Sequence, residues 1–306
     1  MRNYLLLGAL LACGMALTAC SDNASDPSSE TTNPIPTYNL FTDATGSSAP
    51  FVGTGIYRYT MTFPANTVSV SVSSMPVPGG ATLNFATDPV KFTASYLSMP
   101  DGKRAEVIKF GNVVANTPAV SNLNCVLTQA AYAPENVTIP GIEKRYLPSE
   151  LQHFTVMQYD YNHWKVRTFW PDMTFHGTTN TSGATMAEPF STTITSYRIV
   201  MHINDDKSIG NKADIIIYNS AFAANMPSLN IVVKDLDLTF SNAGYEVSGS
   251  DVVPYMIEAG ELQPTPRFIF NNIRFSVTGD LTDVNADFQV AQIFNGSFTG
   301  SSILSE

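Results

Sequence analysis

The sequence predicts an all-β protein of two tandem, related antiparallel β domains, each a lipocalin-like barrel or a β-sandwich. Three observations lead to this fold class. Apolar and polar residues alternate with a period of two over short runs. Turn signals rich in Gly, Pro and Asn separate these runs. The two halves of the chain also resemble each other, which indicates a duplicated unit.

The alternation is clearest at residues 57–63, 68–73 and 273–277, where every second side chain is apolar. This pattern predicts strands with one buried and one exposed face. Residues 215–217 are three consecutive isoleucines, so this segment is predicted to be a central strand that is covered on both faces. Turns are expected at residues 78–80, 100–102, 242–244 and 264–266.

Composition places the chain among folded proteins with a large core. It has 306 residues, of which 44% are hydrophobic and only 14% charged, with a net charge of −10. A chain of this length can be held together by hydrophobic burial without a metal or a disulfide. The acidic balance and the lack of any Lys/Arg cluster argue against a nucleic acid partner.

The first residues read as an export signal. Arg2 precedes an apolar run over residues 4–17 that is too short to span a bilayer. It ends in Leu-Thr-Ala-Cys, a pattern that looks like a bacterial lipobox with Cys20 as the acylated residue. We therefore expect a lipoprotein signal peptide over residues 1–19 and a chain anchored in the cell envelope through Cys20, most simply at the outer membrane, with the membrane as a partner.

The remaining chain divides into three predicted segments. Residues 20–48 are rich in Ser, Thr, Asp, Asn and Pro and are expected to form a flexible tether. An N-terminal β domain is predicted over residues 49–176 and a C-terminal β domain over residues 177–306. The boundary is drawn here because residues 177–189 are rich in Thr, Ser and Gly, as linkers are.

The internal repeat appears at an offset of about 108 residues. Its three matching blocks keep their order and spacing with small gaps. They pair residues 103–110 with 211–218, 114–118 with 223–227, and 150–152 with 261–263.

The second half resembles the calycin-like lipoproteins of anaerobic Gram-negative gut bacteria. The resemblance is carried by the apolar strand that ends in residues 213–218, by the loop over residues 222–227, and by the short amphipathic strands that follow. It implies an antiparallel, lipocalin-related barrel or sandwich. It also implies a protein without assigned enzyme activity that binds a small apolar molecule.

Motifs for catalysis or for cofactors are missing from the sequence. It contains neither a Walker loop nor a GxGxxG, GxSxG or HExxH pattern. Among the four histidines, His153 and His163 flank a predicted hairpin with its turn near residues 161–162, but exposed hairpin histidines are the simpler interpretation. Cys125 lies in an apolar run and is expected to be a buried structural cysteine. We therefore expect no enzyme activity, no cofactor and no metal.

Two loops leave alternatives open. Residues 283–287 space Asp283, Asn285 and Asp287 as a calcium loop does, yet Phe288 and Phe294 occupy the places where an EF-hand needs Gly and Glu. A solvated hairpin turn is therefore favoured over a calcium site. Glu150 and Glu261 precede aromatic strands in both halves and either cap a turn or line the mouth of a binding site.

A dense group of aromatic residues is the candidate ligand-stacking patch. Its members are Tyr159, Tyr161, Trp164, Phe169 and Trp170, with Phe175 close by in the sequence. Such rings stack on sugars or apolar ligands, although cross-strand packing explains them as well. The overall prediction is a non-enzymatic, lipid-anchored module that presents β faces to a macromolecule or glycan. The alternative is a lipocalin-like carrier of a small apolar ligand.

Overall fold

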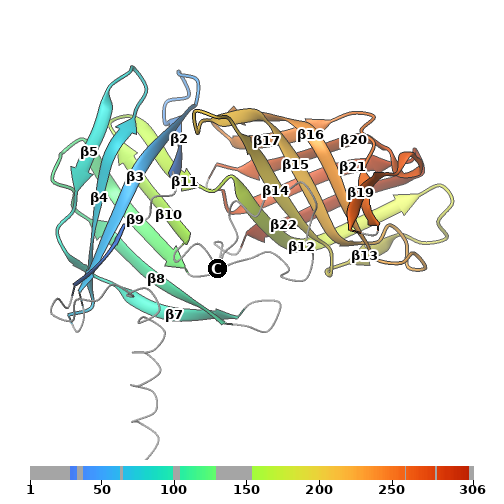
Figure 1. The fold of residues 1–306 in the computed structure, drawn as a ribbon, viewed down its shortest axis with the longest axis horizontal. Coiled ribbons are helices and arrows are strands. Elements are labelled where there is room, and N and C mark those ends of the chain that lie inside the picture. The colour runs from blue at the N-terminus through green and yellow to red at the C-terminus, as the bar shows by residue number, and fades with distance from the viewer. Residues whose placement is uncertain are drawn as a thin grey trace, which may run out of the picture.

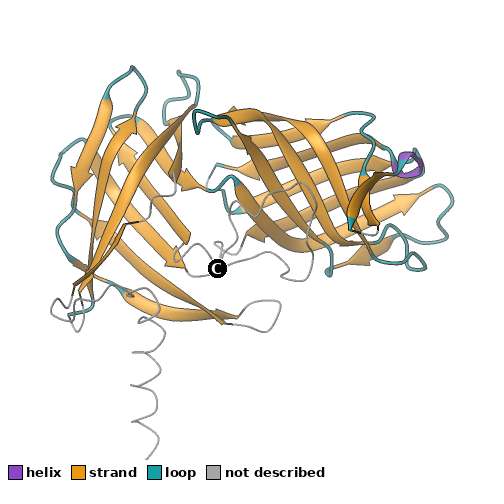
Figure 2. Cartoon of the chain, viewed as in Figure 1, coloured by secondary structure: helices purple, strands orange, loops and turns teal. Residues whose placement is uncertain are grey.

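The computed structural model describes residues 28–32, 37–62, 65–98, 104–128, 154–258, 260–279 and 281–302. In these residues the chain forms two antiparallel β-sheets and one short 3-10 helix, η2 (Pro266–Phe268) (Figure 2). The predicted all-β class with two tandem antiparallel domains is therefore confirmed. In the same residues no helix is long and apolar enough to span a membrane.

The first sheet is a curved meander. Its strands are β1 (Ser28–Thr32), β2 (Thr37–Asp43), β3 (Phe51–Thr62), β4 (Thr67–Pro76), β5 (Thr82–Ala86), β6 (Val90–Lys91), β7 (Thr93–Ser98), β8 (Arg104–Val113), β9 (Val120–Thr128), β10 (Phe154–Tyr161) and β11 (Trp164–Phe169). Strand β11 pairs back with β2, and β6 pairs with β4 while β7 pairs with β8. The sheet thus curls around a core of its own (Figure 1).

The second sheet is a closed barrel of eight strands. These strands are β12 (Asp172–Gly183), β14 (Ser196–Ile203), β15 (Ile209–Ser220), β16 (Leu229–Ser241), β17 (Gly244–Gly249), β20 (Phe270–Thr278), β21 (Asp283–Val290) and β22 (Phe294–Ser302). They follow one another in chain order, and β22 pairs with β12 to close the ring (Figure 1). Closure removes the free strand edges that would otherwise pair with other chains.

Three short strands lie outside the ring. Strand β13 (Phe190–Thr192) pairs with β12, whereas β18 (Tyr255–Glu258) pairs with β16 and then with β19 (Glu261–Pro264). Side chains of β18 and β19 pack on Ile216 and Val232, which point outward from the barrel and are fully buried. Because the neighbouring Ile215 and Ile217 point into the barrel core, β15 is covered on both faces, as its three isoleucines predict.

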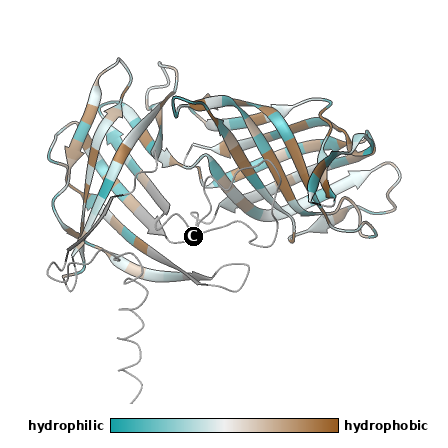
Figure 3. Ribbon diagram, viewed as in Figure 1, coloured by the Kyte–Doolittle hydropathy of each residue, from teal (hydrophilic) through white to brown (hydrophobic). Residues whose placement is uncertain are grey.

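The alternating pattern decides which side chains enter each core. Val68, Val70 and Val72 of β4 are buried, and the serines between them face outward. In the barrel, Ile273, Phe275 and Val277 of β20 point inward in the same way. Figure 3 shows this alternation as hydrophobic and hydrophilic bands along the strands. The period-two segments therefore form the half-buried strands that the sequence predicts.

The predicted tether over residues 20–48 is shorter than expected. Residues 28–32 form strand β1, which pairs with β3, and residues 37–43 form the buried strand β2. Its Tyr38 and Leu40 join the core of the barrel, while Phe41, on the opposite face, joins the core of the first sheet. Polar residues surround this segment, so composition alone predicts an unfolded chain here. Burial on both faces requires a strand between two cores, which composition alone does not reveal.

The boundary between the two domains, predicted after residue 176, lies earlier in the chain, between Phe169 and Asp172. The first sheet ends with β11 at Phe169, and β12 runs as one strand from Asp172 to Gly183 within the barrel. Residues 177–183, which were predicted to be linker, instead pair with β22 and close the ring. A Cβ atom on Gly177 would lie 2.1 Å from the carbonyl oxygen of Thr299, so this glycine reflects close strand packing rather than a flexible linker.

The repeat offset does not match the topology of the described strands. An offset of 108 residues would superpose β8 on β15. Three strands follow β8 before the first sheet returns to β2, whereas five strands follow β15 before the barrel returns to β12. The aligned blocks therefore hold different places in their sheets. What the two halves share is a meander whose last strand pairs back with an early one: β11 with β2 in the first sheet, and β22 with β12 in the barrel.

The two sheets are joined by polar contacts as well as by β2. The Tyr38 hydroxyl donates to the carbonyl of Lys207 in the β14–β15 turn at 3.0 Å. The side chain of Asn242, in the β16–β17 turn, accepts from the Asp43 amide at 3.1 Å and donates to the Ser48 carbonyl at 3.1 Å. Because hydrogen bonds and a shared apolar cluster join them, independent motion of the two sheets is disfavoured.

Asp43 organises this junction and makes it sensitive to acid. Its carboxylate accepts from the Thr45 hydroxyl at 2.6 Å, the Thr45 amide at 2.8 Å and the Ser47 hydroxyl at 3.0 Å. These bonds, that of the Thr45 hydroxyl foremost, hold the pKa of Asp43 well below its ordinary value.

We expect Asp43→Asn to lower the melting temperature at pH 7, since a neutral amide is a weaker acceptor. A depressed folded-state pKa contributes stability that is present above the unfolded value, near 4, and is lost as the pH falls towards the folded value. The difference in melting temperature between wild type and Asp43→Asn should therefore become smaller below about pH 4. Melting curves from pH 7 to pH 2 test this, with Asp283→Asn as control. An unchanged difference at every pH would refute the role of the charge.

Candidate functional site

The interior of the barrel is the first place to look for a ligand, and aromatic side chains fill it. The ring of Tyr197 lies 4.3 Å from that of Phe298 and 5.2 Å from that of Phe275, measured between centroids. The Tyr197 hydroxyl is within hydrogen-bonding distance of the Thr179 hydroxyl, at 3.1 Å. Burial raises the pKa of this tyrosine. An eight-stranded barrel is narrow enough for such side chains to occupy its interior.

One end of the barrel is closed by a second aromatic group centred on Phe222. This residue follows β15, is 2% exposed and stacks on Phe294 at 5.9 Å. Phe270 and Phe268 lie 6.4 and 6.5 Å away. The Thr181 hydroxyl donates to the carbonyl of Phe222 at 2.8 Å, which fixes the loop over the strand ends. We call these four aromatic residues the Phe222 plug.

The first sheet covers the other end of the barrel. Phe169 and Trp170, which lead from β11 into the barrel, are 1% and 2% exposed and belong to the barrel core together with Tyr38. The ring of Phe169 lies 5.7 Å from Phe240, near the end of β16. An apolar ligand would thus have to displace buried side chains at either end.

Most residues of the predicted ligand-stacking patch are buried and do not form a surface together. Tyr159 and Trp164 are buried in the core of the first sheet, and Tyr161 packs partly against it. Phe169, Trp170 and Phe175 belong to the core of the barrel instead. The burial of these rings fits the alternative explanation, cross-strand aromatic packing, rather than a ligand-stacking patch. These aromatic residues are close in the sequence, but consecutive strands place them in two separate cores. Their spacing in the sequence does not show this division.

The core of the first sheet contains a small polar group. The Tyr57 hydroxyl donates to the side-chain oxygen of Asn39, and it lies 3.4 Å from the hydroxyl of Tyr159. The Asn39 amide donates to the carbonyl of Thr37 at 2.9 Å. Cys125 is buried in the same core, which confirms its predicted burial. Burial raises the pKa of its thiol, so the thiolate needed for nucleophilic attack is disfavoured.

The predicted hairpin with its turn at residues 161–162 is confirmed, since Tyr161 pairs with Trp164. His163 is exposed at this turn, with its ring 4.9 Å from that of Trp164. His153 and Glu150 lie outside the described residues. Glu261 is exposed at the turn between β18 and β19 and accepts from the Gln263 amide at 3.4 Å.

The acidic segment at residues 283–287 is neither a turn nor a calcium loop. It begins strand β21, and Asp283, Asn285 and Asp287 alternate with buried residues on its outer face. Side chains two residues apart on one strand are separated by about 6.7 Å, too far for three of them to share one ion as loop ligands do. The predicted hairpin turn is therefore corrected to an exposed strand.

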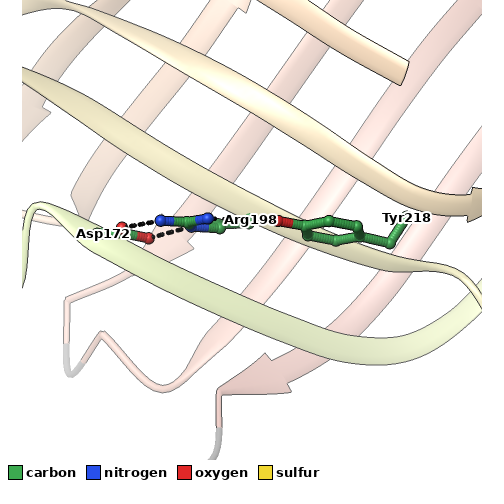
Figure 4. Close-up of polar contacts among 3 residues, drawn as sticks. All are labelled: Asp172, Arg198 and Tyr218. Atoms are coloured by element: carbon green, nitrogen blue, oxygen red, sulfur yellow. Dashed lines mark hydrogen bonds and ion pairs between the residues drawn. The ribbon is translucent and has the colours of Figure 1, made fainter. Parts of the chain in front are cut away.

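A buried ion pair, which sequence reasoning missed, lies on the outer side of the barrel wall, where Arg198 stands opposite the outward-facing Ile216. The guanidinium of Arg198 donates to both carboxylate oxygens of Asp172, with Nε to Oδ1 at 2.6 Å, and its Nη1 donates to the Tyr218 hydroxyl at 3.3 Å (Figure 4). Both charged side chains are only 7% exposed. Together these residues link β12, β14 and β15. Desolvation by burial acts against the charge on Arg198, but Asp172 outweighs it and raises the pKa of the guanidinium.

Comparison with known proteins does not identify the chain. No family model matches it, and neither a curated protein nor a solved structure matches it.

Proposed function

We propose that this protein is a non-enzymatic, lipid-anchored module of the cell envelope that binds glycan polymers through the outer face of its barrel. The observation that carries the proposal is the filled interior. Tyr197 occupies the barrel, the Phe222 plug covers one end and the first sheet covers the other. These contacts argue against the alternative of a small-molecule carrier and leave the outer faces for binding.

One outer face has the chemistry to recognise sugars. On β12, β22 and β21, side chains of neighbouring strands stand side by side in three rows, which we call the polar face. Its members are Thr178, Thr299 and Asn285, then Asn180, Ser297 and Asp287, then Ser182, Asn295 and Gln289. Eight of these nine residues carry a hydroxyl or an amide. Such groups both donate and accept hydrogen bonds, as sugar hydroxyls do.

The polar face is also accessible to solvent. Asn180, Asn285, Asn295 and Thr299 are exposed. Gln289 donates to Asn295 across the strands at 3.0 Å, so side chains on the face hold one another in place. The net charge of −10 disfavours acidic polymers, so neutral polysaccharides are the partners that this surface fits.

Binding of the full chain to insoluble glucan, mannan and chitin, which are neutral polysaccharides, tests this function. We expect retention on at least one of them. The triple variant Asn180→Ala, Asn285→Ala, Thr299→Ala should bind about a hundredfold more weakly, since three lost hydrogen bonds at about 1 kcal/mol each amount to about 3 kcal/mol. A matched variant on the first sheet, Thr60→Ala, Ser69→Ala, Ser71→Ala, should behave as wild type. Absence of binding to all three polymers, or equal retention of both variants, would refute the proposal.

The lipid anchor at Cys20 is part of the same proposal. A tether that starts at an acylated cysteine and ends at β1 would leave the barrel free of the membrane surface. Cys20→Ser should move the chain from the membrane fraction to the soluble fraction of its host. The closed, chain-ordered meander also supports the proposed kinship with calycin-like lipoproteins.

A further inference from the structure

Three neighbouring strands bring metal-ligating side chains together on the outer face of the barrel, away from the polar face. His202 lies near the end of β14, Asp214 in β15 and Asp235 in β16. One nitrogen or oxygen atom of each lies within 4.8 Å of the others. In the sequence these residues are 12 and 21 positions apart, on three strands separated by two turns. Only the pairing of the strands brings them together.

A β-bulge creates this arrangement. Ala213 stands opposite Leu236 and Ile215 opposite Val233, so Asp214 alone faces two residues of β16, Lys234 and Asp235. Asp235 adopts a positive φ of 60°, and its amide donates to Asp214 Oδ1 at 2.9 Å. The bulge therefore directs a second carboxylate towards Asp214 and fixes the orientation of the first.

The two carboxylates have little countercharge nearby. His202 Nε2 lies 3.0 Å from Asp214 Oδ1. Among the residues that the structure describes, this is the ion pair that Asp214 forms. The adjacent lysines are engaged elsewhere. Lys212 pairs with Asp237 at 2.6 Å, and the Lys234 ammonium lies 5.9 Å from the centre of the Tyr255 ring. A bound cation would supply the missing positive charge to Asp214, whose side chain is only 8% exposed.

We propose that His202, Asp214 and Asp235 bind a divalent transition-metal ion of the Zn²⁺ type. One imidazole and two carboxylates form a donor set that suits zinc or manganese better than calcium. Metal bonds of about 2.0–2.2 Å need ligand atoms roughly 3.3–3.6 Å apart. The exposed Asp235 and the half-exposed His202 reach this spacing by side-chain rotation, while Asp214 stays fixed by the bulge.

Three protein ligands leave a coordination position open on the solvent side. A tetrahedral ion bound here would carry a water molecule or a group from a partner in that position. The site is separate from the polar face, so the proposal holds whether or not the protein binds glycans.

Calorimetric titration of the full-length protein, purified without a histidine tag, with ZnCl₂ is the direct test. We expect one site in the wild type and at least tenfold weaker binding in Asp235→Asn and in His202→Gln. Asp237→Asn, which changes a carboxylate on the same strand, and His163→Gln, which changes an exposed histidine of the first sheet, should bind as wild type. Asp214 is left unchanged because the bulge depends on it.

Cobalt gives a second measurement on the same samples. Co²⁺ bound through an imidazole and two carboxylates should give visible absorption bands that the two site variants lose and the two controls keep. Absence of zinc, cobalt and manganese binding by the wild type would overturn the proposal. Equal affinity of the site variants and the wild type would overturn it as well, because the metal would then bind elsewhere.

Discussion

Replacing Arg198 with methionine is expected to lower the free energy of unfolding by about 3–5 kcal/mol, because it leaves the carboxylate of Asp172 buried without its partner. Both side chains are 7% exposed, and the guanidinium also donates to Tyr218. The variant should retain the all-β circular dichroism spectrum but unfold at lower denaturant concentration. Chemical denaturation of wild type and variant measures the effect.

A matched ion pair on the surface provides the control. Arg274 pairs with Glu246 between β20 and β17, with side chains 61% and 29% exposed. Arg274→Met should cost less than about 1 kcal/mol, since exposed pairs contribute little. The double variant Asp172→Leu, Arg198→Met should recover much of the stability lost by Arg198→Met alone, because it removes both charges. Equal losses for Arg198→Met and Arg274→Met would contradict the assigned burial.

Replacing Phe222 with alanine is also expected to have a large effect, lowering the free energy of unfolding by about 3–5 kcal/mol. This ring is 2% exposed and contacts the rings of Phe294, Phe270 and Phe268, so its removal leaves a cavity at the end of the barrel. Apolar cavities of this kind remain dry and take up small apolar molecules. The variant should therefore gain stability in the presence of benzene, and the wild type should not.

This experiment also separates the two functions that the sequence leaves open. A carrier would bind an apolar probe without any substitution, whereas a filled barrel binds it only after a ring is removed. Phe222→Leu, which keeps most of the volume, serves as control and should lose less stability than the alanine variant. Benzene binding by the wild-type protein would favour the carrier.

Local pattern predicts the strands of this protein well, because side-chain direction on a strand depends only on the period of two. Residues 68–72 and 273–277 are buried and exposed as their alternation predicts. The turn at residues 161–162 is equally local, since Asn162 adopts the positive φ of 53° that a tight hairpin turn requires. The errors arise at β2 and at residues 177–183, where polar composition concealed strands that pair with distant partners.

The candidate sites depend on contacts between distant residues. Asp172 meets Arg198 because β12 pairs with β14, and Asp214 meets Asp235 because β16 bulges by one residue. A shift of one residue in either register would move each side chain to the opposite face of the sheet. No spacing in the sequence shows that register, so neither pair was predicted.

The sequence by itself determined that the chain is all-β, that it forms two antiparallel units and that Cys125 is buried, since these properties follow from the order of apolar and polar residues. Only the tertiary structure decided that the aromatic residues fill two cores, that β2 lies between them and that three strands assemble His202, Asp214 and Asp235. The physical reason is that alternation sets the face on which a side chain lies, whereas barrel closure and strand register set the residues that it meets.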